Sequence, residues 1–245
     1  MTTYSPRMGL FSLLKPGREE VRTTKAALDA AASDNPPQDP GVFDRLVEML
    51  VDTGLEGRGP LSSAREQADG VLARNAGDRE KAIGSLARST TIKCGIGGFV
   101  TGLGGYVLMP VSLPINLAEF YVQAVRMVGG IATLRGYDIE EPRVRTAVLL
   151  TLVGSGSEEV LKKAGMTTAS GRLTSYALRG MPPATLMMVN KAVGFRLMRG
   201  VSEKFFTHLG RGIPVAGGLV GGGLDAFMMK QIADHAMKEF PVTTT

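Results

Sequence analysis

The stretch from Cys94 to Pro114, CGIGGFVTGLGGYVLMPVSLP, restricts the possible folds more than any other part of the chain. Six glycines fall within eleven residues, beside large apolar side chains, and no charged residue follows until Glu119. Glycine is costly inside helices and strands unless another backbone must come close. Three interpretations are therefore considered: a phosphate-binding loop, a segment that enters a membrane, and a surface where two helices pack closely.

A phosphate-binding loop has little support. The stretch contains no Walker A pattern. A Gly-x-Gly-x-x-Ala match occurs at Gly221, Gly223 and Ala226, but the dinucleotide-binding motif needs a second strand with an acidic residue about twenty positions further on. Residues 224–240 instead have the pattern of one helix. We therefore expect no nucleotide and no other cofactor.

A membrane segment is considered because residues 94–118 are 25 uncharged residues in a row. A spanning helix needs about 20 apolar residues. Pro110 and Pro114 interrupt the run, and its glycines lower the hydrophobic driving force. We expect no single clean span. A broken or hairpin insertion stays open, because small residues let apolar helices approach closely in lipid.

Close helix packing is the favoured interpretation, because glycines four residues apart place bare backbone on one helix face. Such pairs are Gly98 and Gly102, Gly217 and Gly221, and Gly218 and Gly222. We predict that GGFVTGLGG (97–105) and GGLVGGGL (217–224) pack against each other. The same contact suits a soluble core or an inserted hairpin, so it does not decide localisation.

Apolar residues recur at helical spacing from residue 41 onward, and no segment shows the sustained alternation of a strand. We therefore predict an all-α fold, with a single multi-helix domain over residues 41–241 in which the glycine-rich central and C-terminal helices pack together. Residues 1–40 contain the proline-rich SDNPPQDP and are predicted to be a weakly ordered N-terminal tail.

Positive charge is concentrated in residues 162–211, where the single acidic residue is Glu203. The basic residues of this stretch are Lys162, Lys163, Arg172, Arg179, Lys191, Arg196, Arg199, Lys204 and Arg211. A bias of this kind favours anionic partners. We predict that these side chains form a basic face for an anionic membrane or an acidic protein.

Charged residues on otherwise apolar helices suggest a second kind of site. Glu119 and Arg126 lie on one stripe of the helix predicted from residue 115, and Asp225 follows a long uncharged run. Solvent-exposed helix faces explain these positions simply. The alternative is that Glu119, Arg126 and Asp225 form a buried polar site, in which each charge needs a partner or an altered pKa.

No set of residues indicates a reaction, and we expect the protein not to be an enzyme. Cys94 is the one cysteine, and only two histidines are present, so we expect no metal site. Cys94 is interpreted as a small apolar residue. The single cysteine and the lack of a secretory signal pattern favour the cytoplasm.

The second half of the chain resembles the EcsC family of bacterial proteins. The resemblance rests on LMPVSLPINLAEFYVQAVRMVGGIATLRGYD (108–138), PPATLMMVNKAVGFRLMRGVSEKF (182–205) and RGIPVAGGLVGGGLDAFMMKQIADHAMKEFP (211–241). It implies a helical, cytoplasmic or membrane-associated protein. The family takes its name from an operon that encodes a transporter, which implies a link to transport or secretion, and it supplies no catalytic residues.

Two functions follow from these observations. The first is a non-enzymatic, peripherally membrane-associated helical protein whose basic face binds anionic lipid headgroups. The second is a soluble interaction module that binds an acidic protein partner, or an apolar ligand in a Met-rich groove. Nucleic acid is not an expected partner. The oligomeric state stays open.

Overall fold

The computed structural model describes residues 18–32, 39, 41–103, 105–163, 180–209 and 217–242. Nine α-helices and no strand occur within these ranges, which confirms the all-α prediction. The helices are α1 (Arg18–Ala32), α2 (Val42–Val51), α3 (Ala64–Arg74), α4 (Arg79–Leu103), α5 (Gly105–Leu134), α6 (Pro142–Val153), α7 (Ser157–Lys163), α8 (Pro183–Leu209) and α9 (Gly217–Glu239). A π-helical turn, Asp52–Glu56, continues α2, and a short 3-10 turn, Gly154–Gly156, precedes α7.

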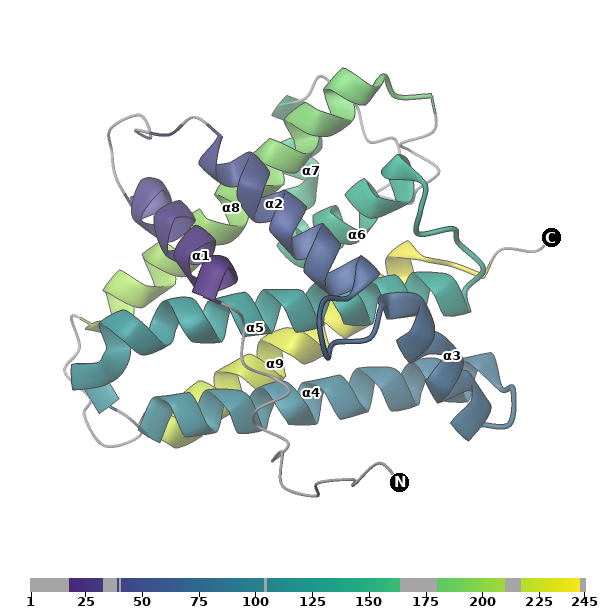
Figure 1. Ribbon diagram of the computed structural model, residues 1–245, viewed down its shortest axis with the longest axis horizontal. Helices are drawn as coiled ribbons and strands as arrows, with labels where there is room; N and C mark the ends of the chain where they lie inside the picture. Colours follow the sequence, from purple (N-terminus) through teal and green to yellow (C-terminus); the bar gives the residue numbers. More distant parts are fainter. Residues whose placement is uncertain are drawn as a thin grey trace, which may run out of the picture.

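Helix α5 is the centre of the fold (Figure 1). It packs against α3, α4 and α9 on one side and against α1, α2 and α6 on the other, while α8 covers α1, α2 and α6. Side chains all around its second half are buried, and Val125, Met127 and Ile131 have no exposed surface. A helix that is apolar on every face must be enclosed by other helices, as α5 is.

Helix α1 lies inside the range 1–40, for which the sequence predicted a weakly ordered tail. It packs against α8, α5 and α2. Its buried positions, Glu20, Thr24, Ala27 and Ala31, recur every three or four residues. Two of them are alanines, whose small side chains add little to an apolar pattern and still let the helix lie close to its neighbours. Residues 1–17, 33–38 and 40 lie outside the described ranges.

The motif Gly-Tyr-Asp at residues 136–138 ends α5 and ties it to the end of α9. Gly136 has φ of 91°, a conformation that glycine adopts without strain, and the Tyr137 amide donates to the Ala132 carbonyl at 3.0 Å. The Tyr137 ring meets the fully buried Phe240 edge-on, with ring centroids 5.2 Å apart. This contact anchors the residue that follows α9 against the turn after α5.

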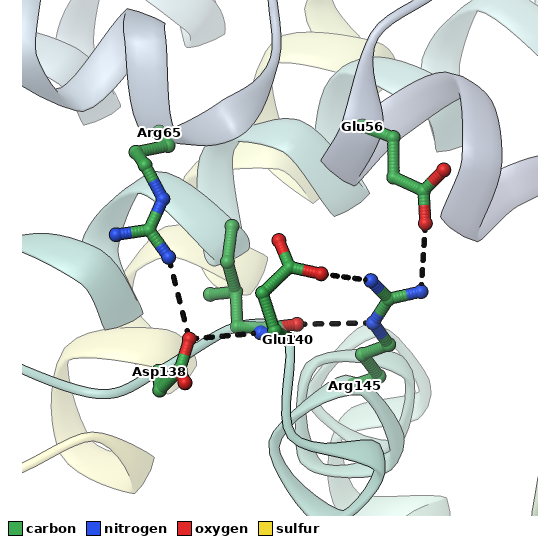
Figure 2. A network of polar contacts seen from close by, with 6 residues as sticks. Glu56, Arg65, Asp138, Glu140 and Arg145 are labelled. Carbon is green, nitrogen blue, oxygen red and sulfur yellow. Dashed lines mark hydrogen bonds and ion pairs between the residues drawn. The ribbon is translucent and has the colours of Figure 1, made fainter.

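A group of ion pairs fixes the connection from α5 to α6 (Figure 2). Arg145 of α6 donates to Glu56 at 2.8 Å, to Glu140 at 2.6 Å and, through Nε, to the Ile139 carbonyl at 3.1 Å. On the other side of the connection, Arg65 of α3 donates to Asp138 at 3.3 Å. Arg145 therefore holds the π-helical turn, the connection and α6 together.

Within the described ranges, no helix has both the length and the apolar character that crossing a bilayer requires. Helix α5 has 30 residues, and it begins at Gly105 and continues past Pro110 and Pro114, where the sequence suggested an interruption.

We expect Arg145→Met to lower the free energy of unfolding by about 1–2 kcal/mol, because it leaves the Ile139 carbonyl and two carboxylates without their donor. Arg65→Met is the matched control. Its side chain is 51% exposed and makes one ion pair, so the expected loss is below about 0.5 kcal/mol. Urea unfolding measures both, and equal losses would contradict this account of the connection.

Candidate functional site

Helices α4 and α9 make the most extensive helix–helix contact among the described residues. Gly95 and Gly222 are at its centre. A Cβ atom added at Gly222 would lie 2.5 Å from the Gly95 carbonyl oxygen and 3.0 Å from the Cβ of Phe99. One added at Gly95 would lie 3.2 Å from the Cβ of Ala226. The two backbones therefore touch, and no side chain fits between them.

The glycines singled out from the sequence divide into two groups. Gly98 and Gly222 are buried in α4 and α9. Gly102, Gly217, Gly218 and Gly221 belong to these helices, but their surroundings lie outside what the structure describes. Gly95, which the four-residue spacing did not select, supplies the closest backbone contact to Gly222.

We expect Gly222→Ala to destabilise the protein by about 1–3 kcal/mol, because the new methyl group would push the α9 backbone away from α4. Gly223→Ala is the matched control. Its Cβ would meet nothing within 4 Å, and alanine is the better helix former, so this variant gains up to about 1 kcal/mol. Thermal and urea unfolding of both variants give the comparison. A neutral effect at Gly222 would show that the helices do not need this contact.

A polar cluster lies where α4, α5 and α9 meet. Asn116 of α5 donates through Nδ2 to the Asp225 carboxylate of α9 at 3.0 Å. Glu119 lies one turn further along α5, and its Oε1 is 3.7 Å from where a Cβ of Gly97 would be. The structure therefore brings Glu119 and Asp225, two of the three residues of the predicted polar site, into one half-buried region.

The surroundings of this cluster favour the protonated, uncharged forms of its acidic side chains. Burial, and second the Asp225 carboxylate, raise the pKa of Glu119 to about 7. Burial also raises the pKa of Asp225, against the hydrogen bond from Asn116. Burial, with smaller contributions from Asp225 and Glu119, raises the pKa of the Cys94 thiol to about 12. Cys94 is therefore a neutral thiol near neutral pH, in agreement with its interpretation as a small apolar residue.

Stability should fall as the pH rises from about 4.5 to about 7, because the pKa of Glu119 is higher in the folded chain than its ordinary value of 4.5. The folded state holds the proton more tightly, so the Glu119 contribution is fully present below this window and is lost above it. Glu119→Gln removes this dependence. We expect the variant to melt at a higher temperature than the original chain at pH 8 and to differ little at pH 4.5.

Glu158→Gln is the control for this measurement, since Glu158 is exposed on α7. The melting temperatures of the original chain and of both variants are measured across this pH range and compared. A parallel pH profile in the Glu119→Gln variant would mean that its carboxyl group is not responsible.

Arg126, the third residue of the predicted polar site, does not join Glu119 and Asp225. Its Nη2 donates to the Ser62 hydroxyl, which precedes α3. Burial lowers the pKa of Arg126, and the nearby Glu66 opposes this effect. The helical spacing of Glu119 and Arg126 places them on one face of α5, as predicted. They are two turns apart, however, and contact different neighbouring helices.

The predicted basic face is partly neutralised. Lys191 of α8 lies 3.3 Å from Asp44 of α2, and Arg196 of α8 lies 2.8 Å from Glu159 of α7. Lys162 is exposed, and Arg199 is half-buried. The side chains of Lys163, Arg172, Arg179, Lys204 and Arg211 lie outside what the structure describes. The charge count within residues 162–211 omitted acids that reach this surface from other segments.

A different surface, which the sequence analysis missed, lies on the exposed side of α4, next to its contact with α9. Ile92 is 51% exposed, Ile96 49% and Phe99 38%. Together with the exposed Arg88 they recur every three or four residues, so they form one ridge on the helix. We call Arg88, Ile92, Ile96 and Phe99 the α4 ridge. The spacing of Ile92, Ile96 and Phe99 shows in the sequence that they share one helix face. Because α4 is apolar on several faces, however, the sequence does not show which of these faces is buried.

The fold and these surfaces define an all-α protein built on a close glycine contact, with an apolar and cationic ridge on one of the contacting helices. The model of the EcsC protein family matches residues 77–242, which include α4 to α9. The chain belongs to the EcsC family. No curated protein and no solved structure matches it.

Proposed function

We propose that this EcsC-family protein is a non-enzymatic helical protein that binds the surface of anionic membranes peripherally, on the cytoplasmic side. The observation that carries the proposal is the α4 ridge, which exposes three large apolar side chains on one helix face. Exposed apolar side chains that recur on one face mark sites of protein or membrane contact.

The charges around the ridge favour an anionic membrane as its partner. Arg88 lies on the ridge, Lys93 flanks it, and α4 contains no acidic residue after Glu80. Each basic residue near an anionic surface contributes about 1 kcal/mol, and each half-exposed apolar side chain that enters the interface adds a similar amount. Two weak contributions of this kind together give stable peripheral binding.

The glycine contact supports the same proposal. Because α5 and α9 pack against α4, the exposed side of α4 is presented on a rigid element. The proposal includes a link to transport or secretion, which is supported by membership of the EcsC family and by no feature of the structure.

A second candidate is an interaction module for an apolar ligand or protein helix. Met187 and Met188 on α8 are 69% and 65% exposed, and flexible methionine side chains suit adaptable binding surfaces. Copurification of a stoichiometric protein partner, together with no affinity for vesicles, would favour it over membrane binding.

Cosedimentation of the full chain with vesicles that contain phosphatidylserine tests the membrane proposal. We expect binding that weakens as salt rises. Ile96→Gln should reduce the affinity by about tenfold, because one apolar side chain no longer enters the interface. Met187→Gln, a change at a more exposed apolar side chain on α8, is the control and should leave binding unchanged. Equal binding to neutral vesicles, or loss of binding in the Met187 variant alone, would contradict the proposal.

A further inference from the structure

A polar pocket of about 210 Å³ lies between α3, α4 and α5, beside the α4 ridge. Residues from all three helices and from the segment before α3 line it. Its polar lining consists of Ser62, Glu66, Gln67, Arg74, Ser89, Lys93 and Arg126. Gly70 and Val71 complete the wall, and the missing side chain at Gly70 widens the pocket.

The three basic residues of this pocket take two positions. Arg126 is half-buried on α5, and its Nε atom is buried without a hydrogen-bond partner. Its Nη2 donates to the Ser62 hydroxyl, which restrains the position of the guanidinium group. Arg74 and Lys93 are exposed, and neither has an ion-pair partner among the described residues. The pocket therefore has a fixed donor group inside and two free cations at its mouth.

The acidic residue in the lining, Glu66, is already engaged. One of its carboxylate oxygens accepts the Ser63 amide at 2.9 Å, and the Ser63 hydroxyl accepts the Glu66 amide at 3.1 Å. This capping box holds the start of α3 and fixes the Glu66 side chain. Three cations against one committed carboxylate leave the pocket with excess positive charge. A buried donor without a partner is costly, so an acceptor is favoured at Arg126.

We propose that this pocket binds a phosphate group, presented by a lipid headgroup or by free inorganic phosphate. A guanidinium group suits the oxygens of a phosphate, because it donates parallel hydrogen bonds to them, and flanking cations add attraction. The Gln67 amide, whose Oε1 is buried without a partner, can accept from a protonated phosphate oxygen.

The position of the pocket connects it to the proposed membrane surface. Lys93 follows Ile92 in the chain, and Ser89 lines both this pocket and a shallow depression of about 480 Å³ that includes Arg88 and Ile92. With the ridge on a membrane, the pocket opens beside the headgroups. The proposal that the phosphate belongs to a lipid headgroup rests on the proposed function. The proposal that the pocket binds free phosphate does not depend on it.

Calorimetric titration of the full chain with inorganic phosphate, at fixed ionic strength and neutral pH, tests the pocket directly. We expect one binding site. Arg74→Gln and Lys93→Gln should each weaken binding about fivefold, and Arg126→Gln at least tenfold. Arg65→Gln is the matched control, since Arg65 lies on α3 but pairs with Asp138 outside the pocket. If Arg126→Gln does not fold, as circular dichroism would reveal, the two exposed positions decide.

Vesicles distinguish the two sources of phosphate. Vesicles with phosphatidic acid, which exposes a terminal phosphate, are compared with phosphatidylserine vesicles of equal charge density. A preference for phosphatidic acid that Arg74→Gln removes supports a lipid headgroup, even where free phosphate binds too weakly to titrate. Binding of free phosphate without such a preference supports the soluble source.

The proposal is overturned if free phosphate does not bind and the two kinds of vesicle bind equally. It is also overturned if Arg65→Gln weakens binding as much as Arg74→Gln does. Binding to phosphatidylserine vesicles that still depends on Ile96 would, in either case, leave the proposed membrane function standing.

Discussion

The backbone contact between Gly95 and Gly222 is the constraint on which the arrangement of α4, α5 and α9 depends. A glycine inside a helix is destabilising by about 1 kcal/mol relative to alanine, and the close approach of two helices has to offset this. Here the approach lets the side chains that flank the glycines meet, and it brings Asp225 next to Asn116. It also fixes which face of α4 is buried and therefore which face, with Ile92 and Ile96, is exposed, while Phe99 lies at the edge of the contact.

The fold class follows from the sequence because helical spacing is a local property of the chain. The segments around the glycine contact were also found from composition. The register of α4 against α9 was not predicted, because the spacing of glycines within one helix does not determine which residue of the other helix each glycine contacts. Helix α1 was overlooked for a related reason. Its buried face contains Thr24, Ala27 and Ala31, which gain stability from α5 and α8 and not from their own hydrophobicity.

Charge was the least predictable feature, because ion pairs join distant segments. Asp44 and Glu159 both lie outside residues 162–211, yet they pair with Lys191 and Arg196. Conversely, Lys93 and Arg74, two of the cations without an ion-pair partner among the described residues, belong to segments whose local charge count is unremarkable. Glu119 and Asp225 show the same dependence on folding, since α5 and α9 bring two acids of distant sequence position together.

In the proposed function, the glycine contact presents the exposed side of α4 to an anionic membrane. The most direct measurement places an environment-sensitive fluorophore on Ile92→Cys, in full-length protein in which Cys94→Ala has removed the native cysteine. The account predicts that anionic vesicles shift the emission to shorter wavelength at residue 92, whereas the same fluorophore on Met187→Cys of α8 does not respond. A shift at residue 187 with none at residue 92 would contradict it.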